Sequence, residues 1–95
     1  MQNIPIQDIY SQTFTTLLNN QQCKINLYQK SSMLYCDLYV ADVLFIGGVV
    51  CQNSNRIVRD EHLEFDGDLF FYDTQGTNDP TTPGLGTRYL FLYVI

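Results

Sequence analysis

Apolar and polar residues alternate along the middle of this chain, and this pattern constrains the fold more than any other feature. Within residues 22–29, for example, Cys23, Ile25 and Leu27 alternate with more polar neighbours. A period of two residues is typical of a β-strand with one buried face, and no window holds the periodicity of a helix. We predict strands over 12–18, 22–29, 33–40 and 43–51, joined by short turns at Asn19-Asn20, Lys30-Ser31-Ser32 and Ala41-Asp42.

Two further strand-like runs lie in the C-terminal part of the chain, at 69–73 and 88–95. The predicted fold is therefore all-β: a small single-domain β-barrel or sandwich of about six mostly antiparallel strands, spanning residues 1–95. The paired glycines Gly47-Gly48 predict a bulge or sharp bend in the fourth strand. Between the two folds we favour a barrel, because such a bend curves a sheet and because closure removes exposed edges.

The remaining segments carry weaker signals. Residues 1–11 contain spaced isoleucines and predict an extended arm, which fits docking on a neighbouring chain as well as packing across its own sheet. Within 52–64, a short helical turn, an irregular crossover and a strand near 56–59 all remain open. The segment 74–87 is too long for a tight hairpin and is predicted to be a long loop.

The charge distribution excludes some functions. Charged residues make up 16% of the chain, against a usual value of about 25%. The net charge is −5, and the window from Asp60 to Asp79 is acidic without any Lys or Arg. A nucleic-acid-binding surface or an anionic membrane surface needs a basic patch, so neither partner is expected. The low charge density fits a β-protein with an uncharged polar surface, or a surface that other subunits cover.

We identify no catalytic constellation and expect no cofactor. The lone histidine, His62, sits between acidic neighbours and is interpreted as a solvated loop residue. The three cysteines, Cys23, Cys36 and Cys51, form no CxxC pair, so we predict buried free thiols and no zinc site.

The acidic turn formed by Glu64, Asp66 and Asp68 is interpreted as a solvated turn, with an adventitious calcium site as the alternative. No metal-binding residue is therefore assigned. No apolar run approaches the ~20 residues of a membrane span, and no signal peptide is visible, so we expect synthesis in a reducing cytoplasm.

Arg88 and the last strand are the candidate functional features. Arg88 is one of five cations in an acidic chain, and we predict that it clamps the long loop by pairing with Asp73 or Asp79 rather than reaching a partner. The last strand has two apolar faces. One must line the core, and the other, if open to water, would mark an interface.

Several short motifs occur in order along nearly the whole chain: Ile4-Pro5, Gln12-Thr13-Phe14, Asp37-Leu38-Tyr39, Gly67-Asp68-Leu69, Asp73, Gly76, Asp79-Pro80, Leu85-Gly86-Thr87-Arg88 and Leu92-Tyr93. In their order and spacing, these motifs resemble a family of small phage proteins, the baseplate plug proteins of contractile-tailed, cyanophage-like myophages. The chain departs from the family at 43–50, where the family often has a Pro-Leu pair and a second proline.

The resemblance implies a structural subunit of the tail baseplate, which plugs or seals the central hub at the end of the tail tube through protein–protein contacts. It implies location in the virion, several copies in a symmetric assembly, and partners among the hub, tube and wedge proteins. We expect the partner interface to use the loop 74–87 and the last strand, with these candidate residues: Asp79, Pro80, Leu85, Gly86, Arg88, Tyr89, Phe91 and Tyr93.

A second class of function is a stand-alone β-barrel module that binds a ligand on stacked aromatic rings. For such a module, carbohydrate is a better ligand than nucleic acid, because the chain is acidic. A glycan array would distinguish this module from a tail subunit. An enzyme is the least favoured class.

Overall fold

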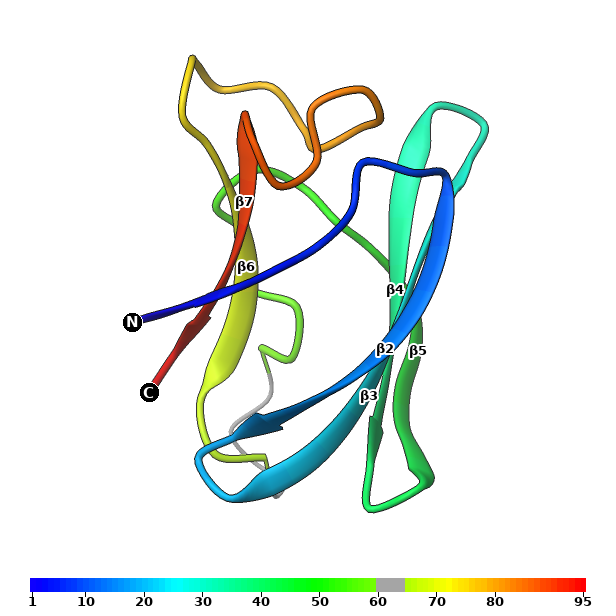
Figure 1. The fold of residues 1–95 in the computed structure, drawn as a ribbon, viewed down its shortest axis with the longest axis vertical. Helices are drawn as coiled ribbons and strands as arrows, with labels where there is room; N and C mark the ends of the chain where they lie inside the picture. Colours follow the sequence, from blue (N-terminus) through cyan, green and yellow to red (C-terminus); the bar gives the residue numbers. More distant parts are fainter. Residues whose placement is uncertain (60–64) are drawn as a thin grey trace.

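The protein is a two-layer β-sandwich (Figure 1). The computed structural model describes residues 1–59 and 65–95. Three strands form one antiparallel sheet in the order β1-β7-β6, and four form the other in the order β2-β3-β4-β5. The strands are β1 (Gln2–Ile4), β2 (Ser11–Leu18), β3 (Gln21–Lys30), β4 (Met33–Val40), β5 (Val43–Val50), β6 (Asp68–Asp73) and β7 (Tyr89–Val94).

The all-β prediction is confirmed, and the preference for a barrel is wrong. The six predicted strands are present, with ends within one residue of the expected positions. No hydrogen-bonded ladder joins the two sheets in the described part of the chain, so the fold is an open sandwich. The seventh strand comes from the predicted arm, where Gln2–Ile4 pairs with β7 of its own chain.

Three two-residue turns with the same backbone conformation connect the strands of the four-stranded sheet. Each pair of turn residues, Asn19-Asn20, Ser31-Ser32 and Ala41-Asp42, has positive φ at both positions. This conformation matches the right-handed twist of the flanking strands, so consecutive strands pair directly as hairpins. The predicted turns at these positions are confirmed.

The glycine pair produces the expected irregularity in β5. Gly48 has φ +64°, and the pairing of β4 with β5 shifts register on both sides of Leu38. The Gly48 N–H donates to Asp37 Oδ1 at 2.7 Å, so a side chain of β4 holds the bulge in place. The bulge is therefore confirmed, but it does not bend the sheet into a closed barrel.

The core lies between the sheets and takes one face from nearly every strand. Phe71 of β6 and Phe91 of β7 stack at its centre, with ring centroids 4.5 Å apart and an interplanar angle of 14°.

The three cysteines are buried and free, as predicted. The neighbouring Cys51 thiol, together with burial, raises the pKa of the Cys36 thiol well above its usual value, so Cys36 is an unreactive core residue.

The crossover from β5 to β6 is irregular over residues 51–59 and runs along the outer edge of β6. The N–H groups of Ser54 and Ile57 donate to the carbonyl oxygens of Phe71 and Leu69, at 2.7 and 2.8 Å. Asp68 is buried rather than solvated, and its carboxylate accepts backbone N–H groups of Val58, Arg59 and Leu69 at 2.7–2.9 Å. The interpretations of His62 and Glu64 concern residues outside the described part of the chain.

Candidate partner interface

An ion pair between buried Asp73 and half-buried Arg88 joins the two ends of the long loop. Asp73 ends β6, and Arg88 directly precedes β7. Arg88 Nε donates to Asp73 Oδ1 at 2.8 Å, and Nη2 donates to Oδ2 at 2.9 Å, a bidentate geometry. The Asp73 side chain is fully buried in this arrangement, while that of Arg88 is 29% exposed. The predicted clamp is therefore confirmed, and its partner is Asp73 rather than Asp79.

The same carboxylate also shapes the first turn of the loop. Asp73 Oδ1 accepts the Gln75 N–H at 2.8 Å, and Oδ2 accepts the Asn78 N–H at 2.9 Å. The side-chain hydrogen bonds from Arg88, supported by these two backbone donors, hold the pKa of Asp73 well below its usual range. The Asp73 carboxylate is thus ionised across the physiological pH range and keeps the loop closed.

Further contacts fix the loop along its whole length. Asp79 Oδ1 accepts the Asn53 N–H at 3.0 Å, and Asn53 Oδ1 in turn accepts the Asp73 N–H at 2.9 Å. Gln29 Oε1 accepts the Thr82 N–H at 2.8 Å, and Asp8 Oδ1 accepts the Gly84 N–H at 2.9 Å. The loop therefore connects the three-stranded sheet to the end of β3 and to the segment before β2. These hydrogen bonds hold the loop in a defined conformation.

Gly86 allows the chain to approach the N-terminal segment closely. It has φ +82°, and a Cβ atom at this position would lie 2.7 Å from the Ile6 carbonyl oxygen. Both the backbone conformation and the contact exclude larger residues. Gly86 is thus needed for the packing of the loop within its own chain.

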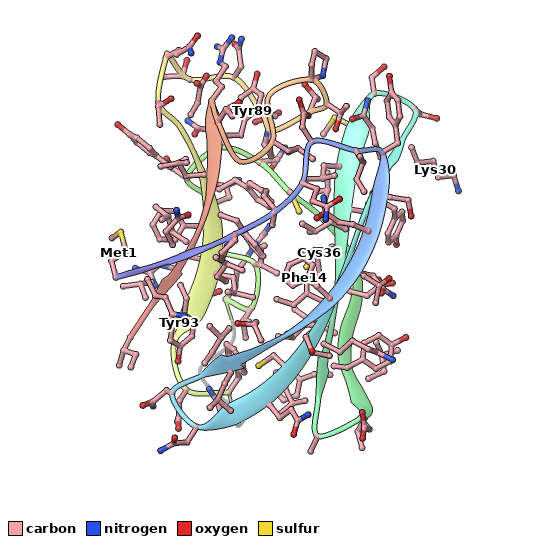
Figure 2. The ribbon with its side chains drawn as sticks, in the orientation of Figure 1. Met1, Phe14, Lys30, Cys36, Tyr89 and Tyr93 are labelled. Atoms are coloured by element: carbon pink, nitrogen blue, oxygen red, sulfur yellow. The ribbon has the colours of Figure 1, made fainter. Side chains whose placement is uncertain are left out.

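The expected exposure of the last-strand aromatics is wrong. Tyr89, Phe91 and Tyr93 are at most 5% exposed and form the core face of β7. Figure 2 shows Tyr89 and Tyr93 near opposite ends of that strand. These large rings fill the space between the sheets: Phe91 stacks on Phe71, and the Tyr93 hydroxyl donates to the Asp66 carbonyl.

The other candidate interface residues divide into two groups. Pro80 and Leu85 belong to the loop, and their side chains are buried, so they support its conformation rather than form its surface. Asp79 and Gly86 are exposed, and Arg88 is half-buried. Whether these three contact a partner stays a prediction.

An uncharged apolar patch covers the outer side of the three-stranded sheet. It lies on β6 and β7, where Phe70 pairs with Leu92 and Tyr72 pairs with Leu90. We define the β6–β7 outer face as Phe70, Tyr72, Leu90, Leu92 and Val94, all half-buried except Tyr72, which is 48% exposed. Apolar patches without charge at their centre are typical of protein–protein interfaces.

Sequence reasoning found the two apolar faces of β7 but assigned them the wrong way round. The size of the side chains is the signal that separates them. Three rings alternate with Leu90, Leu92 and Val94, and the larger set fills the wide gap between sheets. The aliphatic set is then left on the outside.

The outer side of the four-stranded sheet is more polar. Tyr28 stacks on Tyr35 with ring centroids 5.7 Å apart, and Lys24 Nζ lies 4.3 Å from the centroid of the Tyr39 ring. Asp37 lies between these pairs and accepts hydrogen bonds from neighbouring strands. The charged groups at the middle of this face thus have partners within the sheet, whereas the β6–β7 outer face carries no charged group.

The described residues hold no group of three or more His, Cys, Asp or Glu side chains that could bind a metal ion. Over the same ranges, 1–59 and 65–95, no helix is long and apolar enough to cross a membrane.

The fold and surface define a small all-β sandwich protein with an uncharged apolar outer face on one sheet. The family model described as "Cyanophage baseplate Pam3 plug gp18" matches residues 1–95, and the chain belongs to this family. It is thus a structural component of a phage baseplate, located in the virion tail and associated with other baseplate proteins. A search of curated proteins found no match.

Proposed function

We propose that this protein plugs the central hub at the end of the tail tube, and that it acts through protein–protein contacts without catalysis. The family supports the baseplate role. The observation that carries the contact mechanism is the β6–β7 outer face, which exposes aromatic and aliphatic side chains without a charged residue. A plug must stay in place by surface contact until the tail contracts, so an apolar contact face fits the role.

The clamped loop supports this mechanism. A plug under load needs surfaces that do not rearrange, and the Asp73–Arg88 pair fixes the loop beside the start of β7. The loop is thus held in one conformation at the end of the sandwich where β7 begins. Rigid contact surfaces bind with a smaller loss of conformational entropy than mobile ones do.

The experiment places a charge at the centre of the β6–β7 outer face. Leu92→Lys keeps the strand and leaves the core face of β7 unchanged, because the Leu92 side chain points outward. We expect phage that carry this variant to assemble tails from which the protein is missing or strongly reduced, as measured by quantitative mass spectrometry of purified particles. A buried interfacial charge without a partner costs several kcal/mol.

Leu44→Lys is the matched control, because Leu44 lies on the other sheet and is 55% exposed. It makes the same chemical change outside the proposed interface, so its incorporation should equal that of the unaltered protein. Thermal melts of both purified variants establish that each remains folded. Normal incorporation of Leu92→Lys would exclude the β6–β7 outer face as the contact surface.

A further inference from the structure

The two sheets have four edges, and three of them are protected against pairing with another strand. Residues 53–57 cover the edge of β6 with backbone hydrogen bonds. The edge strand β1 has only three residues and ends next to Pro5. The bulge at Gly47-Gly48 interrupts β5. Short strands, prolines, bulges and covering segments are the devices by which β-proteins avoid pairing edge to edge.

The fourth edge, β2, has none of these devices among residues 1–59 and 65–95. Its eight residues contain no charge, no proline and no glycine, and it pairs with β3 in continuous register. Such a strand is a ready template for another chain.

The register shows which backbone groups of β2 point away from the sheet. The Gln29 N–H donates to the Tyr10 carbonyl at 2.8 Å, and Tyr10 is two residues before Gln12. Backbone groups alternate sides along a strand, so the even-numbered residues bond to β3 and the odd-numbered residues point outward. In the part of the chain that the structure describes, the outward N–H and C=O groups have no protein partner: those of Ser11, Thr13, Thr15 and Leu17.

We infer that two copies of the free protein pair through β2, antiparallel, and join their four-stranded sheets into one continuous sheet. The register that uses all four outward residues centres the two-fold axis on Phe14. It places Thr13 opposite Thr15 of the second copy, and such Thr–Thr pairs are favourable across strands. Phe14, which is half-buried against the core, then meets its own equivalent on the inner face (Figure 2).

Charge and geometry both favour a second copy of this chain as the partner of the β2 edge. Each copy carries −5, yet β2 itself is uncharged. The nearest cation on β3, Lys24, is held over the Tyr39 ring on the far side from β2. The pairing therefore brings no like charges together. Because β2 is the one unprotected edge in the described part of each copy, a two-fold pair closes on itself and does not extend into a fibre.

The test is sedimentation of the purified protein over a wide concentration range, together with hydrogen exchange. We expect a reversible monomer–dimer equilibrium, and amides of Thr13, Thr15 and Leu17 that become protected as concentration rises. This inference concerns the free protein and does not require other tail proteins, so its failure leaves the proposed plug role untouched.

Two double variants test the register. T13K/T15K sets lysines opposite each other twice across the two-fold axis and should weaken the dimer about tenfold. T13K/T15E sets opposite charges across the same axis and should leave the dimer intact. Thr13 and Thr15 are both solvent-exposed. The hydrogen bond that Thr13 Oγ1 donates to Asn26 Oδ1 is lost in both double variants alike, so the two variants remain comparable. A protein that stays monomeric at millimolar concentration, or two double variants with the same affinity, would overturn the inference.

Discussion

At the scale of single residues, Asp73 and Arg88 determine the conformation of the loop between β6 and β7. Every oxygen of the Asp73 carboxylate accepts two hydrogen bonds, one from Arg88 and one from the loop backbone. A buried carboxylate with four donors is stable only while its charged partner is present. The family motif residues at these two positions thus have a structural role that the geometry explains.

Replacement of Arg88 by alanine should loosen residues 74–87, because Asp73 then stays buried without its cation. We expect protease cleavage within this loop to accelerate on the order of tenfold. Limited proteolysis with mass-spectrometric mapping of the cleavage sites measures this. Arg56→Ala is the control, since Arg56 is an exposed residue far along the chain from the loop. Equal cleavage rates in R88A and R56A would contradict the clamp.

The lowered pKa of Asp73 predicts an acid dependence of stability. The folded-state pKa lies below the unfolded value of about 4, so ionised Asp73 stabilises the protein above that pH, and this stabilisation fades as pH falls further. The Asp73→Asn variant has no charge at this position and therefore lacks this stabilisation. The difference in melting temperature between the natural protein and D73N should therefore shrink from neutral pH to about pH 2. A difference that is constant with pH would show that the charge of Asp73 does not contribute.

Two glycines with positive φ should respond differently to alanine. Gly48 (φ +64°) has open space where a Cβ would sit, so G48A costs only the backbone strain of about 1 kcal/mol. At Gly86, the Cβ would also meet the Ile6 carbonyl oxygen at 2.7 Å. Denaturant unfolding should show that G86A loses at least about twice the free energy of unfolding that G48A loses. The reverse order would contradict the packing of the loop on the N-terminal segment.

At the scale of elements, the hairpin turns explain the four-stranded sheet, and the turns that begin with Ser31 and Ala41 are less well matched to positive φ than the Asn19-Asn20 turn. Asn tolerates positive φ, whereas Ala41 adopts φ +50° without such a tolerance. The sequence pattern on either side of each turn was sufficient to predict three hairpins. The strand β1 was missed because three residues are too few to show a period.

Replacement of Ala41-Asp42 by Asn-Gly should stabilise the protein by about 1 kcal/mol, which raises the melting temperature by roughly 4–8 °C in a domain of this size. Calorimetry measures this change. Asn19→Ala, at the well-matched turn, should shift the melting temperature in the opposite direction. No gain from the Asn-Gly turn would mean that the conformation at Ala41 is not strained.

The orientation of β7, that is, which of its two faces is buried, could not be predicted from the sequence pattern. Alternation identified two apolar faces, and only the size of the rings, which fill the gap between sheets, decides which face is buried. The clamp was predictable because few cations compete for the carboxylates near Arg88. The choice of Asp73 over Asp79 depends on the register of β6 and β7, where Asp73 lies opposite Tyr89, next to Arg88. The register between β6 and β7 cannot be read from any local pattern in the sequence.

At the scale of the whole molecule, the protein presents different surfaces on its two sheets. The three-stranded sheet carries the apolar outer face, and the four-stranded sheet carries a mixed polar face and one unprotected edge. The carboxylates Asp68 and Asp73 are buried in backbone contacts instead of repelling neighbours. A subunit of this kind can be covered on several sides without burying unpaired charge.

A cryo-electron microscopy reconstruction of the baseplate from the phage that encodes this chain tests the central claim most directly. We expect density for the sandwich on the tail axis at the end of the tube, with Leu92 and Phe70 covered by another baseplate protein. A reconstruction that places the chain away from the axis, with these two residues facing solvent, would contradict it.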